Sequence, residues 1–230
     1  MIISINAGHT ISGVGSGAIG YINESQETRV LTNKIIILLK AYGHVVYNDT
    51  VDYADSTTDS LKKIVTKVNN HNKVDLFVSI HFNSSVDGKG YGSEIYVYNT
   101  KEEHPEASKV LENLQKIGFK NRGIKNGSHL YVVKNTNPKA LLIEVCFVNN
   151  QSDYEMYYNN VDKVAEAIVE GIAGKNITGE SKPQNYISEF EKAKQFVIDN
   201  GISDGSNPTE NITREQVWTM IYRFYNKFIK

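Results

Sequence analysis

A short apolar run near the middle of the chain constrains the fold most. Residues 76–80 (LFVSI) are almost wholly apolar and β-prone, and His81, Phe82 and Asn83 follow at once. Such a run is typical of a strand buried on both faces of a sheet. Open α/β sheets place ligand sites at the carboxyl ends of their strands. His81 would be well held there and could reach a ligand, although one such histidine is more often structural.

Strands and helices are expected to alternate along the first three quarters of the chain. The expected strands cover residues 2–6, 44–47, 76–80, 93–98, 130–133 and 140–147. The expected helices cover residues 24–42, 56–71, 104–119 and 153–173. This alternation predicts an α/β domain over residues 1–175, with a mostly parallel twisted sheet flanked by helices.

The composition shifts to Gly, Asn, Ser, Lys and Pro over residues 174–185, which predicts a linker at 176–185. Two further helices are expected at 187–200 and 213–228, the second opened by a Thr213–Gln216 capping box. Residues 186–230 would thus form a small all-helical module, marginal in size for independent folding.

Charge and cysteine content exclude several classes of protein. The 230 residues carry 25 basic and 26 acidic side chains, so no global positive field indicates a nucleic-acid partner. Cys146 is the sole cysteine, which rules out an internal disulfide. The first residues lack the pattern of a signal peptide, and no apolar run is long enough to cross a membrane. We expect synthesis in the bacterial or host cytoplasm.

Three side chains that could bind a metal or transfer protons are expected at the same edge of the sheet. His9 follows the first strand, His81 follows the central strand, and Glu144 lies near the end of ALLIEVCF. Parallel strands would bring them to one edge. A glycine-rich loop could fold back to add Glu24, with Glu27 as the competing choice. Two imidazoles and a carboxylate are a common catalytic zinc set with an open position for water.

Glu144 is the candidate for moving protons. A glutamate in a buried strand costs free energy unless it is paired or functional, and burial raises its pKa toward the operating range. A glutamate paired with Lys or Arg at the strand end is the equal alternative. His129 is a weaker candidate, since an ordinary exposed histidine is commoner. Cys146 fits a buried inert thiol.

One motif is typical of a different function, dinucleotide binding. Residues 15–20 (GSGAIG) match the dinucleotide-binding fingerprint between a strand and a helix. The first glycine of that fingerprint belongs directly at the strand end, and here eight residues intervene. A nucleotide-binding oxidoreductase is therefore a distant alternative.

Taken together, five segments resemble the zinc-dependent N-acetylmuramoyl-L-alanine amidases of the family 3 type, a domain shared by bacterial autolysins and phage endolysins. The segments are INAGHT (5–10), Glu24 opening a long helix, GHVV (43–46), SIHFN (79–83) and PKALLIEVCFVNN (138–150). The resemblance covers about residues 1–175. It implies zinc on His9, Glu24 and His81, with Glu144 as the catalytic glutamate. The implied reaction is hydrolysis of the amide joining muramic acid to L-alanine in bacterial peptidoglycan.

The sequence departs from this pattern in the first motif. Asn6 and Ala7 stand where Asp-Pro is usual, and Thr10 stands where glycine is common, but no implied ligand changes. Asn83 and Asn149 match recurrent positions of the family. Polar turns at 83–87 and 121–128, the latter with Arg122 and Lys125, are expected to flank the site or to be ordinary solvated loops.

The last helices, with the turn GISDG (201–205) between them, resemble one S-layer-homology motif. That resemblance implies attachment to a cell-wall polymer; the alternative is a helical hairpin for homodimerisation or packing. A chain without a signal peptide fits a phage endolysin released through membrane lesions. Two other functions stay open: a zinc peptidoglycan endopeptidase, and a wall-binding protein without activity.

Overall fold

The structure is a computed structural model that describes residues 1–174, 189–205 and 213–229. The chain divides into two compact units, Met1–Pro183 and Gln184–Lys230. The predicted linker at 176–185 and the predicted domain end at residue 175 fall outside the described residues. Each unit is described below by itself.

The first unit is built on a six-stranded sheet of order β2-β1-β3-β6-β4-β5. The strands are β1 (Ile2–Ala7), β2 (Val45–Asn48), β3 (Leu76–Asn83), β4 (Ser93–Val97), β5 (Asn121–Asn126) and β6 (Lys139–Phe147). Strands β2, β1, β3 and β6 are parallel, whereas β4 is antiparallel to β6 and parallel to β5. The carboxyl ends of four strands therefore meet where β4 and β5 begin.

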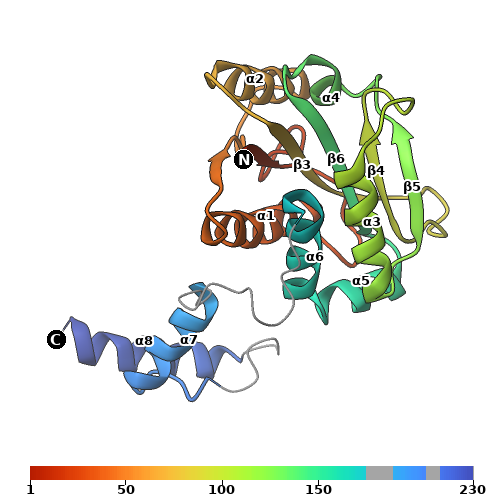
Figure 1. Cartoon of the computed structure of the whole chain (residues 1–230). Helices are drawn as coiled ribbons and strands as arrows, with labels where there is room; N and C mark the ends of the chain where they lie inside the picture. The colour runs from red at the N-terminus through yellow and green to blue at the C-terminus, as the bar shows by residue number, and fades with distance from the viewer. Residues whose placement is uncertain (175–188, 206–212, 230) are drawn as a thin grey trace. The chain divides into compact units, whose positions relative to one another are not determined.

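Helices cover both faces of this sheet, which confirms the predicted α/β class (Figure 1). They are α1 (Glu24–Ala41), α2 (Thr57–Asn70), α3 (Pro105–Ile117), α4 (Tyr131–Asn135), α5 (Gln151–Tyr158) and α6 (Val161–Ala173). Helices α1, α3 and α6 lie on one face, and α2 and α4 lie on the other (Figure 1).

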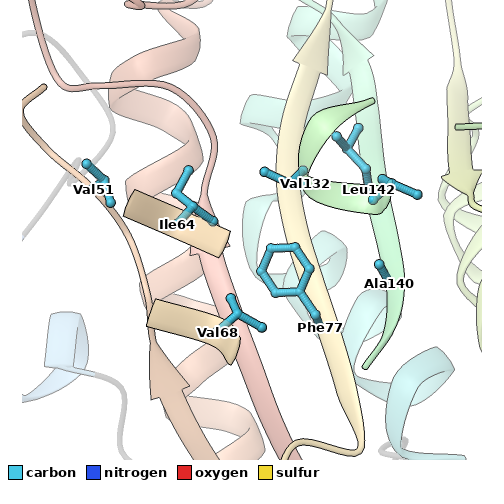
Figure 2. Close-up of a cluster of buried hydrophobic side chains, with 8 residues drawn as sticks. Val51, Ile64, Val68, Phe77, Val132, Ala140 and Leu142 are labelled. Carbon is cyan, nitrogen blue, oxygen red and sulfur yellow. The ribbon is translucent and has the colours of Figure 1, made fainter. Parts of the chain in front are cut away.

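The central strands are buried on both faces, as their continuous apolar sequences require. Every residue from Leu76 to Ile80 is buried in β3, and β6 is buried from Ala140 to Ile143. On the α2 face, Ile64 and Val68 pack with Phe77 and the α4 residue Val132 (Figure 2). Because both faces of the sheet are covered there, β3 and β6 are held firmly in place. The side chains at their ends are therefore held in place as well.

The predicted strand at 130–133 is wrong. Those residues enter α4, where Val132 and Val133 are buried against the α2 face of the sheet, so tertiary packing overrides their β propensity. The strand lies instead at Asn121–Asn126, which the sequence analysis treated as a polar turn. Its one large apolar residue is Ile124, and few apolar residues are needed in an edge strand.

The predicted long helix at 153–173 is two helices, α5 and α6. They are separated at Asn159 and Asn160, and Asn160 is the N-cap residue of α6. Asparagine favours caps and turns over helix interiors because its amide competes for backbone hydrogen bonds. The break leaves α5 as a short helix directly after β6.

The second unit contains α7 (Glu189–Asp199) and α8 (Arg214–Phe228), as predicted. The predicted capping box is present: Gln216 N donates to Thr213 Oγ1, and Thr213 N donates to Gln216 Oε1. Among the residues that the structure describes, no helix combines the length and apolarity needed to cross a membrane.

Candidate metal centre

The sheet brings the predicted site residues to one edge. Strands β1, β3 and β6 are parallel neighbours, with Ala7 beside Ile80 and His81 beside Glu144. His9 follows two residues after the end of β1. The register between β3 and β6 shifts by one residue beyond His81, an irregularity of the kind found next to active sites.

His9, Glu24 and His81 form a compact group. Glu24 Oε1 lies 3.1 Å from His9 Nε2 and 3.3 Å from His81 Nδ1. One ligand atom from each residue falls within 4.8 Å of the other two. Glu24 reaches this position from the first turn of α1, where Asn23 caps the helix by accepting from Gln26 N. Glu27, the competing choice, is outside the group; Tyr157 Oη donates to it at 3.2 Å.

The hydrogen bonds around the group hold Glu24 and His9 in orientations suited to metal binding. The amide of Phe82 donates to Glu24 Oε1 and that of Ala18 donates to Oε2, which holds the carboxylate in place. His9 Nδ1 lies 3.0 Å from the Gly15 carbonyl, which can only accept. His9 therefore carries a proton on Nδ1 and directs Nε2 at the group, the arrangement by which a backbone carbonyl orients a metal-ligating imidazole.

Electrostatics keep Glu24 anionic. Burial opposes its ionisation, but hydrogen bonds from His81 and His9 outweigh burial and hold the pKa of Glu24 well below its usual range. Burial lowers the pKa of His81, which favours the neutral imidazole that binds metals. Burial also opposes protonation of His9, but the Glu24 carboxylate outweighs it and raises the pKa of His9.

The backbone at two glycines lies close to side chains of the group. His9 is the one non-glycine residue with positive φ (63°) among the described residues, a strained conformation of the kind that gathers at functional sites. A Cβ on Gly8 would overlap the His81 ring, and a Cβ on Gly17 would overlap the Glu24 carboxylate. The glycine-rich loop at 15–20 thus folds back onto Glu24, as its sequence allowed.

Replacing Gly8 with alanine should weaken metal binding about 10- to 100-fold, the usual effect of disturbing the residues that orient metal ligands. The added methyl group must displace the His81 ring. The control is Gly43→Ala, which strains a backbone of positive φ (80°) beyond the end of α1 opposite Glu24 and has open space around its Cβ position. Competition with a metal-binding dye measures both affinities; equal losses in the two variants would contradict the expectation.

Glu144 stands beside the group on β6. Its Oε2 atom is buried and has no hydrogen-bond partner among the described residues. Burial, with added repulsion from Glu24 and Glu94, raises the pKa of Glu144 to about 8. No described ion pair joins Glu144 to Lys or Arg, which was the alternative expected from the sequence. The poorly solvated carboxyl group belongs to the residue beside His81 in the sheet and has no neutralising partner among the described residues.

The carboxylate of Glu94 was not predicted from the sequence. Glu94 is buried in β4 directly opposite Glu144, and it accepts from Asn83 Nδ2 at 2.8 Å and Arg122 Nε at 2.9 Å. The Arg122 guanidinium also lies over the Phe147 ring. Glu94 lies in an alternating polar and apolar segment of ordinary appearance, so only the pairing of β4 with β6 reveals its position.

None of the other candidates belongs to the metal-capable group found among the described residues. Lys125 pairs with Tyr96, further from the carboxyl edge, and the His129 ring meets Tyr96 edge-on. Cys146 is fully buried, and burial raises the pKa of its thiol, which fits an inert residue. Asn149 donates to the Ser85 carbonyl at 2.6 Å and so ties the loop after β3 to the loop after β6.

Comparison with known proteins identifies the family. Residues 3–174 match the Amidase_3 model, described as N-acetylmuramoyl-L-alanine amidase. The chain belongs to this family. An endolysin of Bacillus phage SPP1 is 28% identical over 218 residues, covering 89% of this chain and 78% of its own length. The amidase LytC of Bacillus subtilis is 30% identical, over 74% of this chain and 34% of its own.

A solved structure of an endolysin catalytic domain has the same fold. The catalytic domain of the CD27L endolysin targeting Clostridia Difficile superposes with a TM-score of 0.71 and is 32% identical, covering 77% of this chain and 99% of that domain. By contrast, the chain spans about half the length of two uncharacterized Clostridium perfringens proteins that it matches, 55% and 51% of them, at 35% and 32% identity.

Proposed function

We propose that the chain hydrolyses the amide between N-acetylmuramic acid and L-alanine in bacterial peptidoglycan, using a zinc ion. The observation that carries the proposal is the grouping of His9, Glu24 and His81 at the strand edge that also holds Glu144, whose buried Oε2 has no described hydrogen-bond partner, within an amidase-family domain. Names of similar proteins support the substrate: they include an endolysin and amidases.

The donor set fits zinc. Two imidazole nitrogens and one anionic carboxylate are among the three-ligand sets of catalytic zinc sites. His9 Nε2, Glu24 Oε1 and His81 Nδ1 would hold the ion. When bound, zinc would supply Lewis-acid polarisation of the scissile carbonyl and would lower the pKa of water.

Glu144 supplies the proton transfers. In its ionised form it accepts the proton of the attacking water at a carboxylate oxygen while the new C–O bond forms. It then donates that proton to the alanine nitrogen as the C–N bond breaks, so the products are a free lactyl carboxyl group and a free amine. Burial raises the pKa of Glu144, and a nearby cation would lower it again, which would bring the group into the range in which it can perform both transfers.

The identity of the cleaved bond is tested by digesting purified peptidoglycan and labelling the new amino groups. We expect N-terminal L-alanine, intact glycan chains and no new reducing ends. N-terminal D-alanine or diaminopimelate, with L-alanine still attached to muramic acid, would establish an endopeptidase instead. No new termini of either kind, with the chain retained on the sedimented walls, would establish the third candidate, a wall-binding protein without activity.

The second unit is proposed to hold the enzyme on a cell-wall polymer or to join two copies, and the chain is proposed to reach the wall from the cytoplasm as a phage endolysin. Large aromatic side chains on α8, among them Trp218 and Tyr222, are exposed and support an interaction role.

Residues 1–183 alone should fold and cleave soluble wall fragments at near the full-length rate, since the sheet and both helix layers are complete within them. Lysis of whole cells should fall more steeply, because tethering raises the local enzyme concentration. Turbidity loss and soluble-fragment cleavage, measured side by side, check this. Equal loss in both assays would mean that the second unit supports the catalytic fold rather than attachment.

A further inference from the structure

Three tyrosine rings form a continuous row on the first unit. The Tyr21 and Tyr154 rings stack with centroids 5.8 Å apart, and the Tyr154 and Tyr158 rings are 5.0 Å apart. The two outer residues remain largely open to solvent, with Tyr21 55% exposed and Tyr158 46% exposed. Contiguous exposed aromatic surface of this kind marks an interaction site more often than scattered single residues do.

The row is anchored to the segments that carry the metal group. Tyr21 precedes Glu24 by three residues, and its amide donates to the carbonyl of Val148, just beyond β6. Below the row, the Tyr157 ring meets the ring of Phe82 edge-on, and Phe82 follows His81. The row therefore borders the edge of the sheet at which His9, Glu24 and His81 meet.

The charge around the row limits what it can bind. Tyr157 donates to Glu27, and Tyr158 also interacts with Glu27, whose carboxylate raises the pKa of Tyr158 and keeps its hydroxyl neutral. A carboxylate at the Tyr158 end of the row disfavours the phosphates of an anionic wall polymer and the carboxylates of a stem peptide. A neutral ligand with a flat apolar face and hydroxyl groups fits better.

We propose that Tyr21, Tyr154 and Tyr158 bind the glycan strand of peptidoglycan, next to the muramic acid residue whose amide is cut. Sugar rings present faces of C–H groups that pack on aromatic rings, while tyrosine hydroxyls can hydrogen-bond at the edge. This assignment rests on the proposed function. It would make the enzyme prefer polymeric glycan over single muropeptides.

The kinetic test compares soluble glycan polymer bearing stem peptides with a monomeric muropeptide. Tyr21→Ala and Tyr158→Ala should each raise KM for the polymer about 3- to 10-fold, with kcat little changed and a smaller effect on the monomer. Tyr21→Phe should restore most of the affinity. The control is Tyr98→Ala: Tyr98 is 53% exposed but follows antiparallel β4 at the opposite sheet edge. An equal change of KM in Tyr98→Ala would overturn the proposal. An unchanged KM in both Tyr21→Ala and Tyr158→Ala would also overturn it.

Direct binding separates this proposal from the reaction itself. Glu144→Gln is titrated with oligomers of β-1,4-linked N-acetylglucosamine, which carry neither peptide nor phosphate, and with poly(glycerol phosphate). We expect the sugar oligomer to bind and binding to be lost when Tyr21→Ala and Tyr158→Ala are added. Binding of the phosphate polymer alone, or of neither probe, would refute the glycan row, whatever bond the enzyme cuts. Sugar binding by a wild-type chain that releases no L-alanine termini would instead reject only the amidase reaction.

Discussion

Glu144→Gln should lower the turnover of peptidoglycan about 10²- to 10⁴-fold while leaving zinc content and thermal unfolding nearly unchanged. Glutamine has almost the same shape, but its amide cannot accept the proton of the attacking water. The side chain makes no described hydrogen bond through its buried Oε2, so the fold loses no described bond there when the carboxyl is replaced. Initial rates on labelled peptidoglycan measure the effect.

Glu94→Gln is the matched control, because Glu94 lies directly opposite Glu144 in the sheet. This change leaves Arg122 without its carboxylate partner and should reduce stability more than turnover. We expect turnover within about tenfold of wild type. Near-normal turnover in Glu144→Gln would reject Glu144 as the proton carrier.

Removing the metal should abolish activity, by about 10³-fold or more, since Lewis-acid stabilisation contributes several kcal/mol to the barrier. Dialysis against a chelator removes the metal, and stoichiometric zinc should restore the rate of wild type. His81→Ala should lack activity before and after zinc addition, because one of three ligands is gone. Its fold is checked by far-UV circular dichroism.

The control for this loss is His71→Ala. His71 pairs with Asp49 and stacks on Tyr47, away from the metal group, so its removal affects stability without affecting zinc. Full activity in chelated wild type, or recovery of His81→Ala by zinc alone, would reject the proposed metal centre.

The sequence predicted the central part of the fold because its signals are strong there. Buried strands such as Leu76–Ile80 must be apolar throughout, and parallel pairing places His9, His81 and Glu144 at one edge whatever the surrounding loops do. Glu24 required a further inference, that a glycine-rich loop folds back, and the space that Gly17 leaves for the carboxylate explains how it does so.

The parts that sequence could not predict depend on contacts between distant residues. Nothing local distinguishes β5, a polar edge strand, from a turn, and nothing local shows that the β-prone residues Val132 and Val133 would pack as a helix on Phe77. The pairing of Glu94 with Glu144 likewise follows from the reversed direction of β4, which the alternation of strands and helices does not reveal.

The zinc content of two glutamate variants tests the proposed zinc ligands most directly. Glu24 and Glu27 lie in the same turn of α1, but Glu24 contacts both imidazoles and Glu27 contacts Tyr157. Each is replaced by alanine, purified with equimolar zinc, desalted and analysed by mass spectrometry for bound metal. We expect about one zinc per chain in wild type and Glu27→Ala, and almost none in Glu24→Ala. Full zinc in Glu24→Ala, or its loss in Glu27→Ala instead, would contradict that expectation.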